Sequence, residues 1–274
     1  MEFMALFIWL CLCLLVGGLM HYVMVGALSH RLVQLLAAPG MVVRKFTMSL
    51  TALLCGGTVT RVRIYELSSR DIDFQADGAS SVAKVLVPLA PLFGCAALMV
   101  ALNAIFGNPL NLNYAPPALA SLDSGGLKGF FLGTWDLLSR VIRQAARADW
   151  GSLDLYVLFA LTFSLALGAC APLERVKEAM LGAGLIAVVL AVLSSLAVRR
   201  GPADIPAQPE WFVGVKTFIV GTSAAAFVMM IYGMAGALVT GLCVRAYELI
   251  VKSDRSGKGK TANLRSSGNK KRAA

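Results

Sequence analysis

The sequence predicts an all-α integral membrane protein of about five transmembrane helices, with a small β-hairpin after the first span and an interfacial amphipathic helix. Of its 274 residues 58% are hydrophobic, whereas soluble domains contain about 45–50% apolar residues. A helix crosses a bilayer with about 20 consecutive apolar residues. Five stretches approach or exceed this length, and we place them at 3–27, 82–106, 154–172, 179–198 and 213–243.

The first stretch is expected to remain as a membrane span. No basic segment precedes its apolar run, and no small-residue cleavage site follows within the usual reach, so a cleaved signal peptide is not indicated.

The distribution of basic residues predicts the orientation of the chain. With five spans, 17 of the 25 Lys and Arg lie in residues 28–80, residues 173–178 and the C-terminal end. Six lie on the opposite side, and cytoplasmic loops carry the excess of basic residues. We therefore expect a multi-pass protein of an inner or plasma membrane with its C-terminus in the cytoplasm.

Two short segments after the first span have the alternating pattern of β-strands. Apolar and polar residues alternate at 46–51 and again at 61–65, and Gly56-Gly57 lies between them as a turn signal. The sequence therefore predicts a hairpin over about 44–67.

Residues 128–148 have the pattern of an interfacial amphipathic helix. Acidic and basic residues share one helical face at spacings of four, three and four: Asp136, Arg140, Arg143 and Arg147. Another face is apolar, with Phe131, Trp135, Leu138 and Ile142. A Trp beside apolar residues is typical of a helix at the headgroup level of a membrane.

The chain is expected to divide into a membrane core at 1–198, an additional C-terminal span with an amphipathic extension at 199–252, and a basic tail at 253–274. The tail is polar and shows no periodicity, so we expect it to be disordered. Its Lys and Arg residues indicate anionic lipid headgroups as partners. No nucleic-acid-binding module is evident.

The stretch VGALSH (25–30) lies at the end of the first span. His21 and His30 are the two histidines of the chain. At about 100° per residue they lie on opposite faces of a straight helix, which excludes one metal between them there. A zinc helix instead uses H-E-x-x-H, in which the two histidines share a face and the Glu is the base.

These residues resemble the motif of site-2-protease-like (M50-type) intramembrane metallopeptidases, in particular a branch whose first helix ends in HELSH. GALSHRLVQLLAAPG keeps the Leu-Ser-His half and the break at Pro39-Gly40. Downstream, VLVPLAPLFGCAALMVAL (85–102) resembles an APL-rich span, and APLERVKEAM (171–180) resembles the segment of the third ligand. The resemblance covers about residues 10–198.

The departures from that pattern determine what the resemblance implies. Gly26 replaces the first ligand His and Ala27 replaces the base Glu, which leaves His30 and Glu174 as remnant ligand candidates and His21 as a weaker one. Catalytic zinc requires three protein ligands and an activated water. The resemblance therefore implies a non-catalytic pseudoprotease that acts as a membrane scaffold, adaptor or regulator, with no cofactor and no metal expected.

Two alternatives stay open. An active intramembrane metallopeptidase would hold zinc with an unusual set such as His21, His30 and Glu174. A structural or lipid-interacting membrane protein would share only its topology with the protease family. Apart from lipid, the expected partner is a single-span membrane protein or another membrane subunit, since small residues in the last spans permit close helix contacts.

Overall fold

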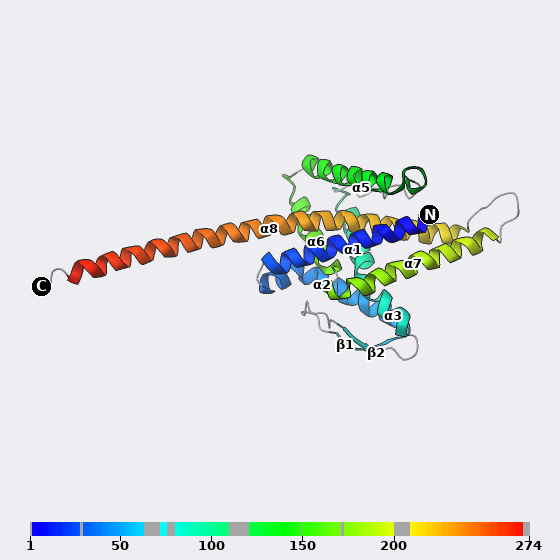
Figure 1. Cartoon of the computed structure of the whole chain (residues 1–274), viewed down its shortest axis with the longest axis horizontal. Helices are drawn as coiled ribbons and strands as arrows, with labels where there is room; N and C mark the ends of the chain where they lie inside the picture. The colour runs from blue at the N-terminus through cyan, green and yellow to red at the C-terminus, as the bar shows by residue number, and fades with distance from the viewer. Residues whose placement is uncertain are drawn as a thin grey trace.

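The computed structural model describes residues 2–27, 30–62, 72–75, 80–109, 121–148, 150–170, 173–199 and 209–270. In these residues helices dominate and one small sheet is present (Figure 1). The elements are α1 (Glu2–Ala27), α2 (His30–Leu54), β1 (Thr58–Val62), β2 (Ile72–Gln75), α3 (Ser80–Leu86), α4 (Ala90–Ile105), α5 (Ser121–Arg147), α6 (Leu153–Ala169), α7 (Leu173–Arg199) and α8 (Glu210–Lys270).

Three helices among the described residues are long and apolar enough to cross a membrane. Their apolar parts are Phe3–Met24 of α1, Arg175–Ser195 of α7 and Glu210–Tyr247 of α8. The spans predicted at 82–106 and 154–172 correspond to shorter apolar helices, α4 with 16 residues and α6 with 17. The chain is thus an all-α protein with helices of membrane-spanning length, and the count of five spans stays a prediction.

The long helices α1, α7 and α8 run side by side (Figure 1). α1 packs against α7 and α8, while α4 and α6 both contact α8. α2 packs against α6 and α4 and also contacts α1. The sheet and α3 border α2.

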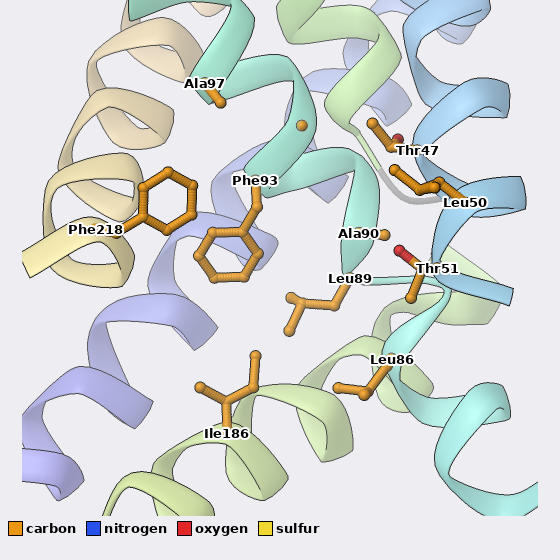
Figure 2. A pocket seen from close by; sticks show the side chains of 11 residues that line it. Thr47, Leu50, Thr51, Leu86, Leu89, Ala90, Phe93, Ala97, Ile186 and Phe218 are labelled. Carbon is orange, nitrogen blue, oxygen red and sulfur yellow. The ribbon is translucent and has the colours of Figure 1, made fainter. Parts of the chain in front are cut away.

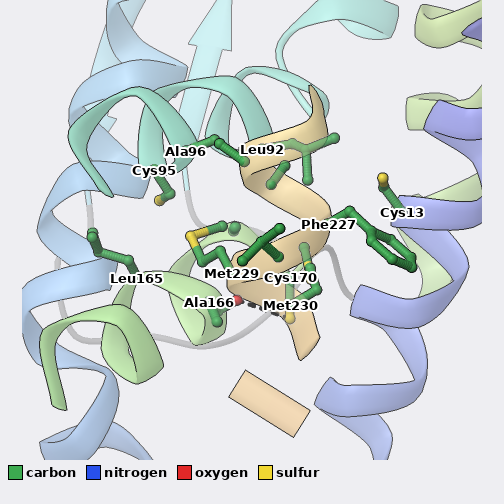
Figure 3. Close-up of a cluster of buried hydrophobic side chains, with 14 of the residues drawn as sticks. Cys13, Leu92, Cys95, Ala96, Leu165, Ala166, Cys170, Phe227, Met229 and Met230 are labelled. Atoms are coloured by element: carbon green, nitrogen blue, oxygen red, sulfur yellow. Dashed lines mark hydrogen bonds between the residues drawn. The ribbon is translucent and has the colours of Figure 1, made fainter. Parts of the chain in front are cut away.

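The core lies where α8 meets α1, α4 and α6 (Figure 3). The Trp9 ring of α1 lies against the Phe227 ring of α8 at a tilt of 44°, with centroids 4.6 Å apart, and meets Phe130 of α5 edge-on at 6.1 Å. Trp9 and Phe130 are almost completely buried. Trp9 therefore joins three helices that are far apart in the sequence.

The segment predicted as a single span at 82–106 is divided between two helices, so its continuity was predicted wrongly. α3 ends at Leu86, a turn occupies 87–89, and α4 begins at Ala90. Pro88 lies in the turn and Pro91 in the first turn of α4. Proline lacks an N–H donor and disfavours helix in the residue before it, which explains the interruption.

The first strand of the hairpin predicted over 44–67 is wrong, because that segment is helical. Residues 44–54 form the C-terminal part of α2, and the antiparallel pair is β1 with β2, in which Val62 pairs with Ile72. The alternation at 46–51 coincides with a helical pattern: Ala37, Met41, Met48 and Ala52 are all buried, at the helical spacings of four, seven and four residues. Burial of that helical face decided against the strand.

Two further predictions concern the later helices. Residues 128–148 were expected to be helical, and they lie in α5 apart from the last residue, as the pattern indicated. The tail was expected to be disordered, but α8 continues to Lys270 and extends beyond the other helices (Figure 1). Extending an existing helix requires no new nucleus, so residues of weak helix propensity continue it.

Candidate functional site

The predicted zinc-motif positions lie on two different helices. α1 ends at Ala27 and α2 begins at His30, so Gly26 and His30 do not share one helix. Leu28 and Ser29 lie outside the described residues. The relation i, i+4 on one face, which a zinc helix requires, does not hold across a helix boundary. This arrangement differs from the helix that the HELSH resemblance implies.

Of the other predicted site residues, only Gly26 and His21 are described beyond the backbone. Gly26 is exposed, and a Cβ there would meet no atom within 4 Å. His21 is half-buried in α1. The side chains of Ala27, His30 and Glu174 lie outside the described side chains. Among the residues that the structure does describe, no group of three or more His, Cys, Asp or Glu is placed to hold a metal.

The closest helix contact that we identify in the core is the crossing of α2 and α6. A Cβ at Gly40 would collide with the backbone carbonyl of Ser164, and a Cβ at Gly168 would collide with the carbonyl of Gly40. The Gly40 N–H donates to the Ser164 hydroxyl at 2.9 Å. Only glycine permits two backbones to approach so closely, as at helix interfaces in membranes. We call these residues the α2–α6 crossing.

Two cations are buried one turn after that crossing. Arg44 of α2 donates through its guanidinium to the carbonyl of Gly168 at 3.4 Å and to the carbonyl of Cys170. These carbonyls lie at the C-terminus of α6, where the helix dipole favours positive charge. Lys45 is also buried. In the sequence, Arg44 and Lys45 count only as basic residues of the cytoplasmic loop at 28–80. The apolar helical pattern of α2 indicates that they are buried, but this segment is predicted as a strand from its alternation.

A first pocket, of ≈ 310 Å³, is lined by residues of α2, α3, α4, α7 and α8 and of the turn between α3 and α4 (Figure 2). Phe93 and Phe218 lie beside each other in its wall. Thr47 contributes little polarity, because its hydroxyl donates to the carbonyls of Val43 and Arg44, both at 3.0 Å. This pocket offers an apolar lining without a chemically reactive group.

A second pocket is larger, at ≈ 610 Å³, and we call it the α5 pocket. Its walls come from α5, from Trp150 in the α5–α6 connection, from α6 and α8, and from Leu36 of α2. Edge-on contacts link Trp150 to Phe159 at 6.3 Å and Phe159 to Tyr232 at 5.8 Å, which forms an aromatic wall. Neither pocket was predicted from the sequence, because its lining comes from elements distant in the chain.

The polar atoms of Trp150 and Thr240 in this lining are already used within the protein. The Trp150 indole N–H donates to the Ala145 carbonyl at 3.0 Å, and the Thr240 hydroxyl donates to the Gly236 carbonyl at 2.7 Å. An occupant would therefore meet mostly apolar surface, which favours binding of an apolar group without chemistry.

The helix α5 has three distinct faces. Phe130, Leu137 and Val141 are buried against the bundle. Phe131, Trp135 and Ile142, which share the predicted apolar face with Leu138, are exposed. The charged face carries Asp136 and Arg140, which form an exposed ion pair. The apolar surface of α5 is thus wider than the bundle covers, and its uncovered part adjoins the α5 pocket at Ile142.

Comparison with protein-family models, with curated proteins and with solved structures gives no match for this chain.

Proposed function

We propose that the chain is a non-catalytic integral membrane protein that acts as a scaffold or adaptor for an apolar partner. The observation that carries this proposal is the α5 pocket, an opening of ≈ 610 Å³ with apolar walls. Its volume is within the range of about 300–1,000 Å³ typical of ligand sites. Such a site supplies shape and apolar contact, which is what binding without reaction requires.

The helix boundary between Ala27 and His30 also supports a non-catalytic function. On the resemblance to site-2-protease-like metallopeptidases, Gly26 and Ala27 occupy the positions of the first ligand and the base. Neither residue has a side chain able to bind zinc or accept a proton. On that resemblance, the chain is a pseudoprotease-like scaffold.

The proposed orientation places the C-terminus in the cytoplasm of an inner or plasma membrane. Whether α1, α7 and α8 alone cross, or α4 and α6 cross as well, the number of crossings is odd and the termini lie on opposite sides. The basic residues of α8 after Leu242 favour the cytoplasmic side and anionic lipid. Reporter fusions at each terminus test this: a periplasmic or lumenal reporter active at the C-terminus would contradict it.

Metal analysis with a cleavage assay tests the non-catalytic proposal. The full-length protein, purified in detergent with zinc present, is expected to contain far less than one zinc per chain and to leave single-span substrates uncleaved. The double variant Gly26→His and Ala27→Glu is expected to gain neither zinc nor activity, because its new side chains lie on α1 while His30 lies on α2.

The rival proposal is an active metallopeptidase that uses His21, His30 and Glu174. It predicts one zinc per chain, with zinc and cleavage lost together in His30→Ala. That result would overturn the scaffold proposal. The variant Cys243→Ala serves as the control, because Cys243 is an exposed potential metal ligand that belongs to neither set.

A further inference from the structure

We infer that the α5 pocket is a binding site for one acyl chain of a membrane phospholipid. The inference rests on the proposed function, because it names the apolar partner of that same pocket. Three features of the pocket carry it: where it opens, how large it is, and which side chains stand at one end.

The pocket opens toward the surroundings along apolar side chains. Ile142 of α5 and Val239 of α8 line it and yet remain 57% and 62% exposed. Phe131 and Trp135 continue the exposed apolar surface along α5. Exposed apolar surface of this extent is unfavourable in water and favourable against lipid. The pocket is therefore continuous with surface that lipid would cover in a membrane.

The volume of the pocket distinguishes an acyl chain from a helix. A spanning helix about 10 Å wide and 30 Å long displaces roughly 2,400 Å³, whereas the pocket holds ≈ 610 Å³. A transmembrane helix of a partner would therefore not fit within it. A flexible hydrocarbon chain follows an elongated apolar space and buries methylene groups at about 0.8 kcal/mol each on transfer from water.

One end of the pocket has the residues expected beside a phospholipid headgroup. Trp150 and Tyr156 line it and are partly exposed, with ring centroids 6.1 Å apart. Trp and Tyr favour the boundary between hydrocarbon and headgroups because each has an apolar ring with a polar edge. The Trp150 indole N–H donates to the Ala145 carbonyl, which fixes the Trp150 ring at this end of the pocket.

Photo-crosslinking of the full chain in vesicles tests the inference. The vesicles contain phosphatidylcholine, a fraction of which carries a diazirine near the end of one acyl chain. After illumination, labelled peptides are quantified by mass spectrometry. We expect the label to be enriched on residues 156–163 and 231–240 relative to the exposed apolar surface of α7 at Val188 and Val192.

Two filling variants provide the decisive comparison. Ala160→Phe and Ala235→Phe each place a ring into the pocket from a small residue that lines it. We expect pocket labelling to fall about tenfold, which corresponds to a loss of about 1.4 kcal/mol of binding free energy. Ala104→Phe is the matched control, because Ala104 is an exposed alanine of α4 outside the lining of this pocket, and its labelling should equal that of the wild type.

The outcomes separate the two proposals. Equal labelling of the pocket and of α7, unchanged by either filling variant, would overturn the acyl-chain site and leave the scaffold proposal standing. Release of the protein from vesicles by alkaline carbonate would overturn both. If both filling variants fail to fold, the enrichment in the wild-type protein decides alone: absence of enrichment rejects the site.

Discussion

The α2–α6 crossing and the α5 pocket represent opposite ways of packing against α6. At the crossing, the backbones of Gly40 and Gly168 meet with no space for a methyl group, and the Gly40 N–H donates to Ser164. At the pocket, aromatic side chains of the same helix line a space of ≈ 610 Å³ together with residues of α5 and α8. Close packing fixes the relative position of two helices, whereas the open packing leaves room for another molecule.

The two regions differ in the hydrogen-bond partners of their polar side chains. Ser164 and Arg44 both bond to backbone groups at the crossing and satisfy them inside the core. Polar groups of the α5 pocket, such as the Thr240 hydroxyl, bond to their own helix and leave the lining apolar. We therefore expect substitutions at the crossing to change stability and substitutions at the pocket to change binding.

The largest effect is expected from a methyl group at the crossing. Gly40→Ala places Cβ against the backbone of Ser164, so the helices must move apart and the expected cost is about 3 kcal/mol, at the upper end for overpacking. Thermal unfolding of the detergent-solubilised protein measures it. The control Gly221→Ala, where nothing lies within 4 Å of the new atom, should gain about 0.5–1 kcal/mol. Equal melting of both variants would refute the crossing as described.

The next effect concerns the buried guanidinium. Arg44→Leu removes the donor from the carbonyls of Gly168 and Cys170, and the expected loss is about 2–3 kcal/mol, typical for hydrogen bonds to a charged group. Arg143→Leu on the exposed face of α5 should change stability by less than about 0.5 kcal/mol. Chemical unfolding monitored by tryptophan fluorescence distinguishes them. A similar loss in both variants would mean that charge alone, not the cap on α6, stabilises the protein.

A smaller effect is expected from one hydroxyl. Ser164→Ala leaves the Gly40 N–H without this acceptor and should cost about 1 kcal/mol. Ser195→Ala is the matched control, because Ser195 is exposed and its hydroxyl donates to the Val192 carbonyl of its own helix at 2.8 Å. The two melting temperatures should differ, with Ser164→Ala lower. The crossing would be less important than we describe if the order were reversed.

The smallest effect on stability is expected at the pocket. Ala160→Phe adds a ring into existing space, so the free energy of unfolding should change by less than about 0.5 kcal/mol, although labelling by the lipid probe falls. The same melting experiment measures this change beside Gly40→Ala. A loss as large as that of Gly40→Ala would show that the region around Ala160 packs as closely as the crossing, and the contrast between the two regions would not hold.

Much of the helical arrangement follows from runs of apolar residues. The bounds predicted at 3–27 and 154–172 lie close to α1 and α6, because a charged or polar residue marks each end of the run. Residues 44–54 were predicted as part of a hairpin because their apolar residues fit both a period of two and a helical period. Only the burial of Met41, Met48 and Ala52 on one side distinguishes the two patterns.

The candidate site was less predictable than the fold. The pattern VGALSH predicts that Gly26 and His30 belong to one helical motif, but α1 ends at Ala27 and α2 begins at His30. The chain contains no strong stop signal at Leu28-Ser29, so the local pattern did not indicate the boundary. The residues of the α5 pocket carry no motif at all, since apolar side chains at helical spacing look the same whether they face a neighbour or an empty space.

The sequence by itself determined that this chain forms long apolar helices with a basic C-terminal end, because hydrophobic length and charge are local properties of a segment. Only the tertiary structure decided that Gly40 and Gly168 lie in contact, that Arg44 donates to carbonyls of α6, and where the α5 pocket forms. The crossing and the Arg44 hydrogen bonds join residues 124 to 126 positions apart, and the pocket lining comes from four helices. Their energies arise only when these helices meet at a particular register.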